Sequence, residues 1–189
     1  MAEAGGRARS GMVVGSIIAL VFGTVFVEVN SGGLPGNGPL VVRIAGVVVA
    51  VGLLIAVLRA ARGGAAGGVP GGGFADRRYW NIVGIEGLAL FGGLAVINAV
   101  VGRPEFAVPW IALVVGVHFL VLGQVWRLEL FKWLGVGQTV LGVAGFVLAA
   151  IGASKTTVEV VAGVLSGVAL FATVAAAVFR ARPAATVGS

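Results

Sequence analysis

The chain has 189 residues, of which 59% are hydrophobic and only 11% are charged, and its mean hydropathy is +1.10. These values are typical of a membrane protein and exclude an ordinary soluble domain. With no cysteine and a single histidine, the sequence offers no disulfide, no thiolate nucleophile and no cysteine-based metal site. The net charge of +6 is then explained better by basic loops beside a membrane than by nucleic-acid binding.

Six apolar runs in the chain are each long enough to cross a bilayer, which takes about 20 residues in a helix. They predict an all-α polytopic membrane protein with six transmembrane helices arranged as three helical hairpins, in one integral membrane domain that covers residues 1–189. A glycine-rich segment at 60–79 cannot build a core and is predicted to be a flexible linker. The predicted helices cover about 12–29, 40–58, 80–101, 109–126, 135–153 and 158–179.

Two patterns of recurring residues are found along these runs, and both include glycines. Gly15, Phe22 and Gly23 return as Gly84, Phe91 and Gly92, at an offset of 69 residues, which supports related hairpins. Small residues four apart predict faces on which helices approach closely. Such ladders occur at Gly11, Gly15, Ala19 and Gly23, at Gly145, Ala149 and Ala153, and at Gly163 and Gly167.

The basic residues divide unevenly between the two sides of this topology, ten against three. Because short cytoplasmic loops carry the excess of Lys and Arg, both termini are predicted to be cytoplasmic in the cell inner membrane. Four tryptophans near span ends, at 80, 110, 126 and 133, are predicted to be interfacial anchors. The ten are Arg7, Arg9, Arg59, Arg62, Arg77, Arg78, Arg127, Lys132, Arg180 and Arg182; the three are Arg43, Arg103 and Lys155.

Two ionisable side chains fall inside the predicted spans, Glu86 in the third and His118 in the fourth. A charged group there costs about 2.5 to 3.5 kcal/mol on insertion scales, so both are candidates for catalysis. Measured from the cytoplasmic ends of their helices, Glu86 lies roughly 9 Å deep and His118 about 13 Å deep. Since consecutive helices are antiparallel, we expect the two side chains to share one pocket. The alternative is a structural carboxyl that holds helices together.

Other residues of the same hairpin could line such a pocket and bind a substrate. Some are polar and some aromatic. We expect no metal and no cofactor, since the usual metal and phosphate motifs are absent. The candidate lining residues are Asn81, Asn98 and Gln124, and Trp80, Phe91 and Phe119.

The segment Trp80-Asn81-Ile82-Val83-Gly84-Ile85-Glu86, followed by Asn98 and by Pro109 to Val117-His118-Phe119, resembles a pattern of small bacterial six-span membrane proteins. That pattern combines an intramembrane Glu with a Pro…Val-Gly-x-His-Phe segment. In size, hydrophobicity and Glu86 the chain is also similar to small membrane-embedded terpene cyclases. That second resemblance implies a metal-free, multi-helical enzyme in which an intramembrane carboxyl serves as the acid.

Three functions stay open at this point. The first is an intramembrane cyclase in which Glu86 is a general acid, His118 tunes or reprotonates it, and the substrate is an apolar isoprenoid. The second is a small proton-coupled transporter in which the same pair relays protons. The third is a membrane scaffold without a small substrate. The lipid bilayer is the expected surrounding in every case, and the oligomeric state stays open.

Overall fold

The structure is a computed structural model that describes residues 2–63 and 77–180, and every regular element in these two ranges is helical. The all-α prediction is therefore confirmed. Two π-helical turns occur: Ile97–Val101 continues α3, and Val160–Val164 joins α6 to α7; a 3-10 turn, Pro104–Phe106, precedes α4. The helices are α1 Ala2–Asn30, α2 Gly38–Arg62, α3 Arg77–Val96, α4 Ala107–Val125, α5 Glu129–Ala150, α6 Lys155–Glu159 and α7 Leu165–Arg180.

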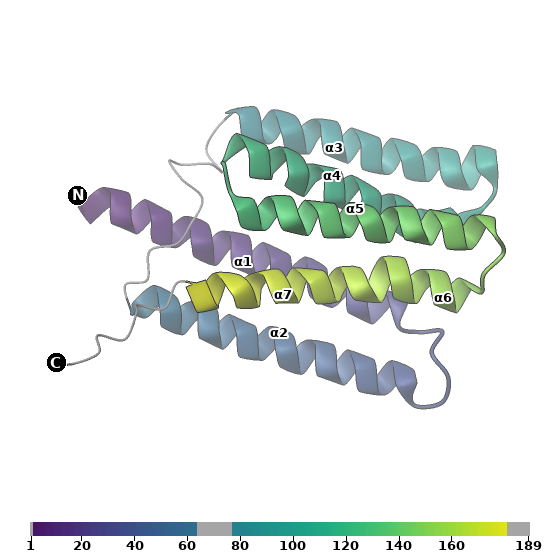
Figure 1. Ribbon diagram of the computed structural model, residues 1–189, viewed down its shortest axis with the longest axis horizontal. Helices are drawn as coiled ribbons and strands as arrows, with labels where there is room; N and C mark the ends of the chain where they lie inside the picture. The colour runs from purple at the N-terminus through teal and green to yellow at the C-terminus, as the bar shows by residue number, and fades with distance from the viewer. Residues whose placement is uncertain (1, 64–76, 181–189) are drawn as a thin grey trace.

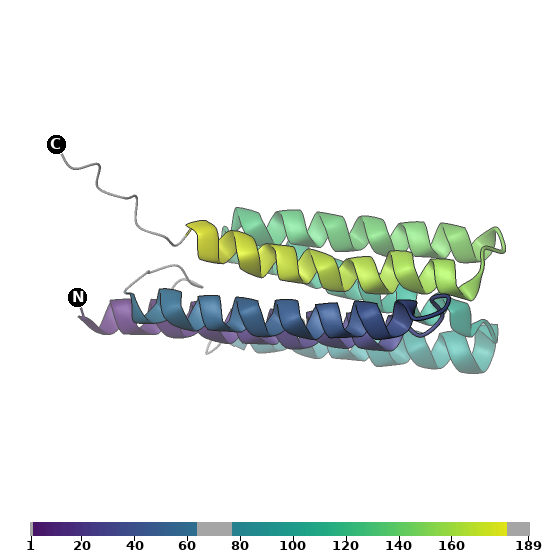
Figure 2. The same ribbon diagram turned by 90° about the horizontal axis from the view of Figure 1, so that it is seen from below.

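Within the described residues, six helical segments are long and apolar enough to span a membrane, with α6, its π turn and α7 forming the last. They lie side by side along the long axis of the molecule (Figures 1 and 2). The start of α1 and the end of α7 lie at the same end of the bundle (Figure 1). We call this the base-rich end, since it holds Arg59, Arg62, Arg77, Arg127, Lys132 and Arg180; the opposite, base-poor end holds Arg43, Arg103 and Lys155.

Several helices extend beyond their predicted limits. α5 begins at Glu129, six residues before the predicted 135, because charged residues are accommodated in its first turn, where Lys132 Nζ lies 2.5 Å from Glu129 Oε1. The connection from α4 is correspondingly short: Arg127 takes a left-handed conformation, φ 54°, and the Leu128 amide donates to the Gly123 carbonyl. The predicted linker 60–79 is shorter in the structure, because α2 continues to Arg62 and α3 begins at Arg77. Residues 64–76 lie outside the described residues.

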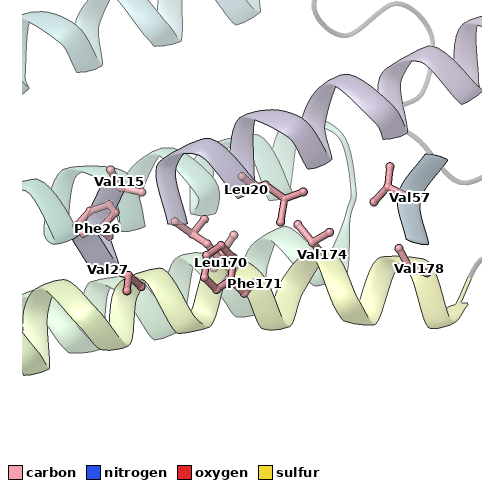
Figure 3. Packing of buried hydrophobic residues seen from close by; sticks show 11 residues of the cluster. Leu20, Phe26, Val27, Val57, Val115, Leu170, Phe171, Val174 and Val178 are labelled. Atoms are coloured by element: carbon pink, nitrogen blue, oxygen red, sulfur yellow. The ribbon is translucent and has the colours of Figure 1, made fainter. Parts of the chain in front are cut away.

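The largest cluster of buried apolar side chains lies where α7 packs against α1 and α2 (Figure 3). Leu170 and Val57 are almost completely buried there. α1 and α7 meet at two glycines, since a β-carbon at Gly167 would lie 2.6 Å from the carbonyl oxygen of Gly23. Gly23 and Gly167 both belong to predicted packing ladders. Their backbones approach as closely as those ladders require.

The closest helix pair, α4 with α5, packs through glycines that the four-residue ladders did not reveal. A β-carbon at Gly142 would lie 2.7 Å from the Leu113 nitrogen, and one at Gly123 would lie 2.7 Å from the Lys132 nitrogen. The small or closely packed residues recur every seven positions, the period expected of helices crossing at a small angle. They are Pro109, Gly116 and Gly123 on α4 and Gly135, Gly142 and Ala149 on α5; all are buried, and Ala149 alone among them belongs to a predicted ladder.

α3 lies at the edge of the bundle and packs mainly against α4; it is the least buried of the six spans (Figure 1). The sequence repeat between the first and third spans is not matched in packing. Gly23 is buried against Phe171, whereas a β-carbon at Gly92 would meet nothing within 4 Å, and Phe91 is exposed. The repeat therefore describes length and residue type, and each hairpin packs in its own way.

Replacing Gly142 by leucine should destabilise the protein, because the side chain would enter the backbone of α4. Overpacking of this kind typically costs about 1 to 3 kcal/mol. Gly137→Leu on the same helix is the matched control, since a β-carbon there meets nothing within 4 Å. Thermal unfolding of the purified protein in one detergent measures both. Equal melting temperatures for the two variants would contradict the packing described for α4 and α5.

Candidate functional site

Glu86 and His118 lie in direct contact between α3 and α4: Nδ1 of the imidazole faces Oε2 of the carboxylate. The side chains are 21% and 14% exposed, so most of the surface of each is covered by protein. Both residues are well inside membrane-spanning segments, Tyr79–Val101 and Pro104–Val125. The sequence placed the two groups in similar membrane layers, and the structure brings their titratable atoms together.

The contact belongs to a regular seam between α3 and α4. On α3 the seam residues are seven apart and on α4 they are eight apart, close to whole numbers of helical turns. The Trp110 indole lies against Gly93, where a β-carbon would overlap it, and Nε1 donates toward the carbonyls of Ala89 and Leu90, both at 3.3 Å. From the base-rich end, the contacts are Tyr79 with Trp126, Glu86 with His118 and Gly93 with Trp110.

A continuous series of ring contacts, which we call the aromatic chain, connects the pair to the base-rich end. His118 meets Phe119 edge to face with ring centroids 5.3 Å apart, and Tyr79 stacks on Trp126 at 5.8 Å. The rings come from α3, α4, the turn after α4 and α5, and they pack with the apolar side chains of Ile82 and Leu122. In order, the chain runs His118, Phe119, Phe131, Trp126, Tyr79 and Trp80.

The predicted lining residues divide into two groups in the structure. Phe119 touches His118, and Trp80 ends the aromatic chain with most of its ring exposed. The other four do not lie against the pair. Phe91 is exposed on the outer face of α3, and Asn98 is exposed with its amide donating to the Leu94 carbonyl. Asn81 and Gln124 are likewise exposed.

Three aromatic residues beside the site were missed as candidates: Tyr79, Trp126 and Phe131. Helical spacing could have found the first two, because Tyr79 lies seven residues before Glu86 and Trp126 eight residues after His118. Phe131 lies between the predicted fourth and fifth spans, and the structure has it in the first turn of α5. Trp110 and Trp126 also differ from simple interfacial anchors, since their rings pack against α3.

The bundle interior holds a second polar contact away from the pair. Gln138 of α5 is completely buried and its Nε2 donates to the Ser166 carbonyl at 3.1 Å, while Ser166 Oγ donates to the Ala162 carbonyl. These bonds join α5 to the first turn of α7, just after the π turn. Among the described residues, no three His, Asp or Glu side chains group as metal ligands would.

No family model, no curated protein and no solved structure matches this chain. The class of protein is inferred from the fold instead. The six apolar helices define a multi-pass membrane protein with one carboxylate–imidazole pair inside the membrane-spanning part that the structure describes.

Proposed function

We propose that the protein is an intramembrane enzyme that cyclises or isomerises an apolar, isoprenoid-type substrate by acid catalysis. The observation that carries the proposal is the contact between His118 Nδ1 and Glu86 Oε2 within the α3–α4 seam. An acid needs a base that can return its proton, and imidazole is the side chain suited to do this near neutral pH. The carboxyl that would act as the acid and the imidazole that would act as the base are in direct contact.

The aromatic chain supports a substrate that becomes cationic. The face of an aromatic ring attracts a cation by about 0.5 to 2 kcal/mol, and more strongly where water is excluded. Phe119 adjoins His118 directly, and Phe131 follows at 5.4 Å between ring centroids. A carbocation formed beside Glu86 would lie near rings that stabilise positive charge without reacting with it.

The position of the seam at the edge of the bundle also favours an apolar substrate. α3 packs mainly against α4, so the exposed fifth of the Glu86 side chain faces the surroundings of the bundle, which inside a bilayer are lipid tails. A molecule dissolved in the bilayer can enter such a site laterally, directly from the lipid phase. A carrier for polar solutes, in contrast, usually binds its substrate near the bilayer midplane, at the interface between its helical repeats.

The proposed reaction keeps atoms and charge in balance. The Glu86 carboxyl gives its proton to an epoxide oxygen of the substrate, whose C–O bond breaks to leave a hydroxyl and a carbocation, or to an alkene carbon, whose π bond breaks to leave a carbocation on the neighbouring carbon. The carbocation adds to a second double bond to close a ring and then loses a proton to His118. His118 returns that proton to the Glu86 carboxylate through Nδ1, so the product is an isomer of the substrate and the pair is restored.

Replacing Glu86 by glutamine should abolish turnover without loss of protein, because the amide keeps the shape and hydrogen bonding but has no acidic proton. General-acid catalysis commonly supplies about 10² to 10⁴ in rate, and a loss in this range is expected. Glu86→Asp should retain a fraction. The assay is expression in membranes with an epoxy-isoprenoid, with protein level and cyclised product measured together.

The matched control is Glu105→Gln, which removes a carboxylate that is ion-paired with Arg103 at the base-poor end, away from the seam. It should leave turnover unchanged. Wild-type turnover by Glu86→Gln at equal protein level would contradict the acid role. Absence of product from the wild type, together with proton-driven uptake into vesicles that Glu86→Gln abolishes, would favour the transporter.

We also propose that the base-rich end faces the cytoplasm of a bacterial inner membrane. Each base at the opposite end has a carboxylate partner: Arg103–Glu105 at 2.7 Å, Lys155–Glu159 at 3.6 Å and Arg43–Glu28 at 3.7 Å. Among the described residues, Lys and Arg are also more numerous at the base-rich end, and because the positive-inside rule counts these residues, it assigns that end to the cytoplasm.

Single cysteines test this orientation, since the chain has none of its own. Gly72→Cys and Ser189→Cys should react with an impermeant maleimide only after the membrane is opened. Pro35→Cys, in the exposed connection between α1 and α2 at the base-poor end, should react in intact cells. The reverse pattern of labelling would overturn the orientation.

A further inference from the structure

An apolar groove of about 310 Å³ runs between α1 and α2, on a different part of the molecule from the Glu86–His118 pair. One wall is formed by five residues of α1 between Ile17 and Val25, and the other by Ala50, Val51 and Leu54 of α2. The one polar side chain in the lining is Thr24, whose hydroxyl already donates to the Leu20 carbonyl at 2.8 Å. The groove therefore offers a ligand apolar contact surface, and its one polar side chain is already hydrogen-bonded within α1.

Packing on either side explains why the groove exists. Toward the base-poor end, α1 and α2 meet closely where a β-carbon at Gly46 would lie 2.9 Å from Val27. Toward the base-rich end, Val57 of α2 is completely buried in the core. Between these points the small side chain of Ala50 on α2 leaves space that neither helix fills.

One charged residue lies above the groove on the same side of α2. Arg62 follows Val51 by eleven residues, three full turns, so the two share a helix face about 16 Å apart. That distance is close to the half-thickness of the hydrocarbon core, about 15 Å. Arg62 is exposed in the last turn, and none of the described carboxylates lies within ion-pair distance of it.

We propose that this surface is a binding site for an anionic phospholipid, with one acyl chain in the α1–α2 groove and the phosphate at Arg62. The apolar lining fits the chain, and the guanidinium fits the phosphate, which it can bind with two parallel hydrogen bonds. The depth of the groove below Arg62 matches a chain that descends from a headgroup at the membrane surface. The site is independent of Glu86 and of the activity proposed above.

The headgroup part is tested by native mass spectrometry of the purified full chain with equal amounts of phosphatidylglycerol and phosphatidylcholine of identical chains. The wild type should retain the anionic lipid in preference. Arg62→Gln should lower that preference by about fivefold, the effect expected for one arginine near a charged headgroup. Arg77→Gln is the matched control, because Arg77 is exposed at the same end of the bundle but begins α3, on the opposite side of the bundle from α2 (Figure 1).

The groove part is tested with tryptophan substitutions at half-exposed positions of the two walls, Val51→Trp and Val21→Trp, each of which fills the space without entering the core. Retention of either lipid should fall severalfold, because the indole displaces the acyl chain from van der Waals contact with the two walls. Val48→Trp is the matched control, since Val48 is 64% exposed on α2 and does not line the groove.

Two results would overturn the proposal. Equal loss of preference in Arg62→Gln and Arg77→Gln would show that the lipid responds to the general positive charge of this end and not to Arg62. Equal lipid retention in Val51→Trp, Val21→Trp and Val48→Trp would show that no chain occupies the groove. Each variant must give a monodisperse chromatography peak and an unchanged helical circular dichroism spectrum. Because the two groove variants lie on different helices, the test still stands if one of them fails to fold.

Discussion

The close approach of helix backbones at small residues is the constraint on which the rest of the structure depends. Between lipid-embedded helices there is little hydrophobic driving force, so association relies on van der Waals contact at short range. Gly116 and Gly142 bring α4 and α5 together, and Gly23 and Gly167 do the same for α1 and α7. Side chains at these positions would separate the helices.

These contacts determine how the site is presented. Because α5 covers the glycine face of α4, the face that carries His118 is directed toward α3. α3 is then held by a seam of three contacts, of which the Glu86–His118 pair is the central one. A pair that attaches a peripheral helix can also contribute to assembly, so its chemical role is separated from its structural role only by substitutions that preserve shape, such as Glu86→Gln.

The sequence predicted the fold well because bilayer thickness sets the length of apolar runs, and it predicted the approach of Glu86 and His118 because consecutive spans are antiparallel. The sequence predicted less well which helices pack against each other and through which faces. The seven-residue spacing of Gly116 and Gly123 was present in the sequence, but which helix face meets which neighbour depends on the whole bundle. For the same reason Phe91 and Asn98, chosen by residue type, lie on the outer side of α3.

The contact between Glu86 and His118 is the central claim, and the single histidine of the chain makes it directly measurable. Solid-state NMR of protein labelled with ¹⁵N only in histidine, in lipid bilayers, reports on His118 alone. We expect the Nδ1 resonance to shift in Glu86→Gln and to stay unchanged in Glu105→Gln, because only Glu86 adjoins the ring. An Nδ1 resonance that is identical in the wild type and in Glu86→Gln would contradict the contact.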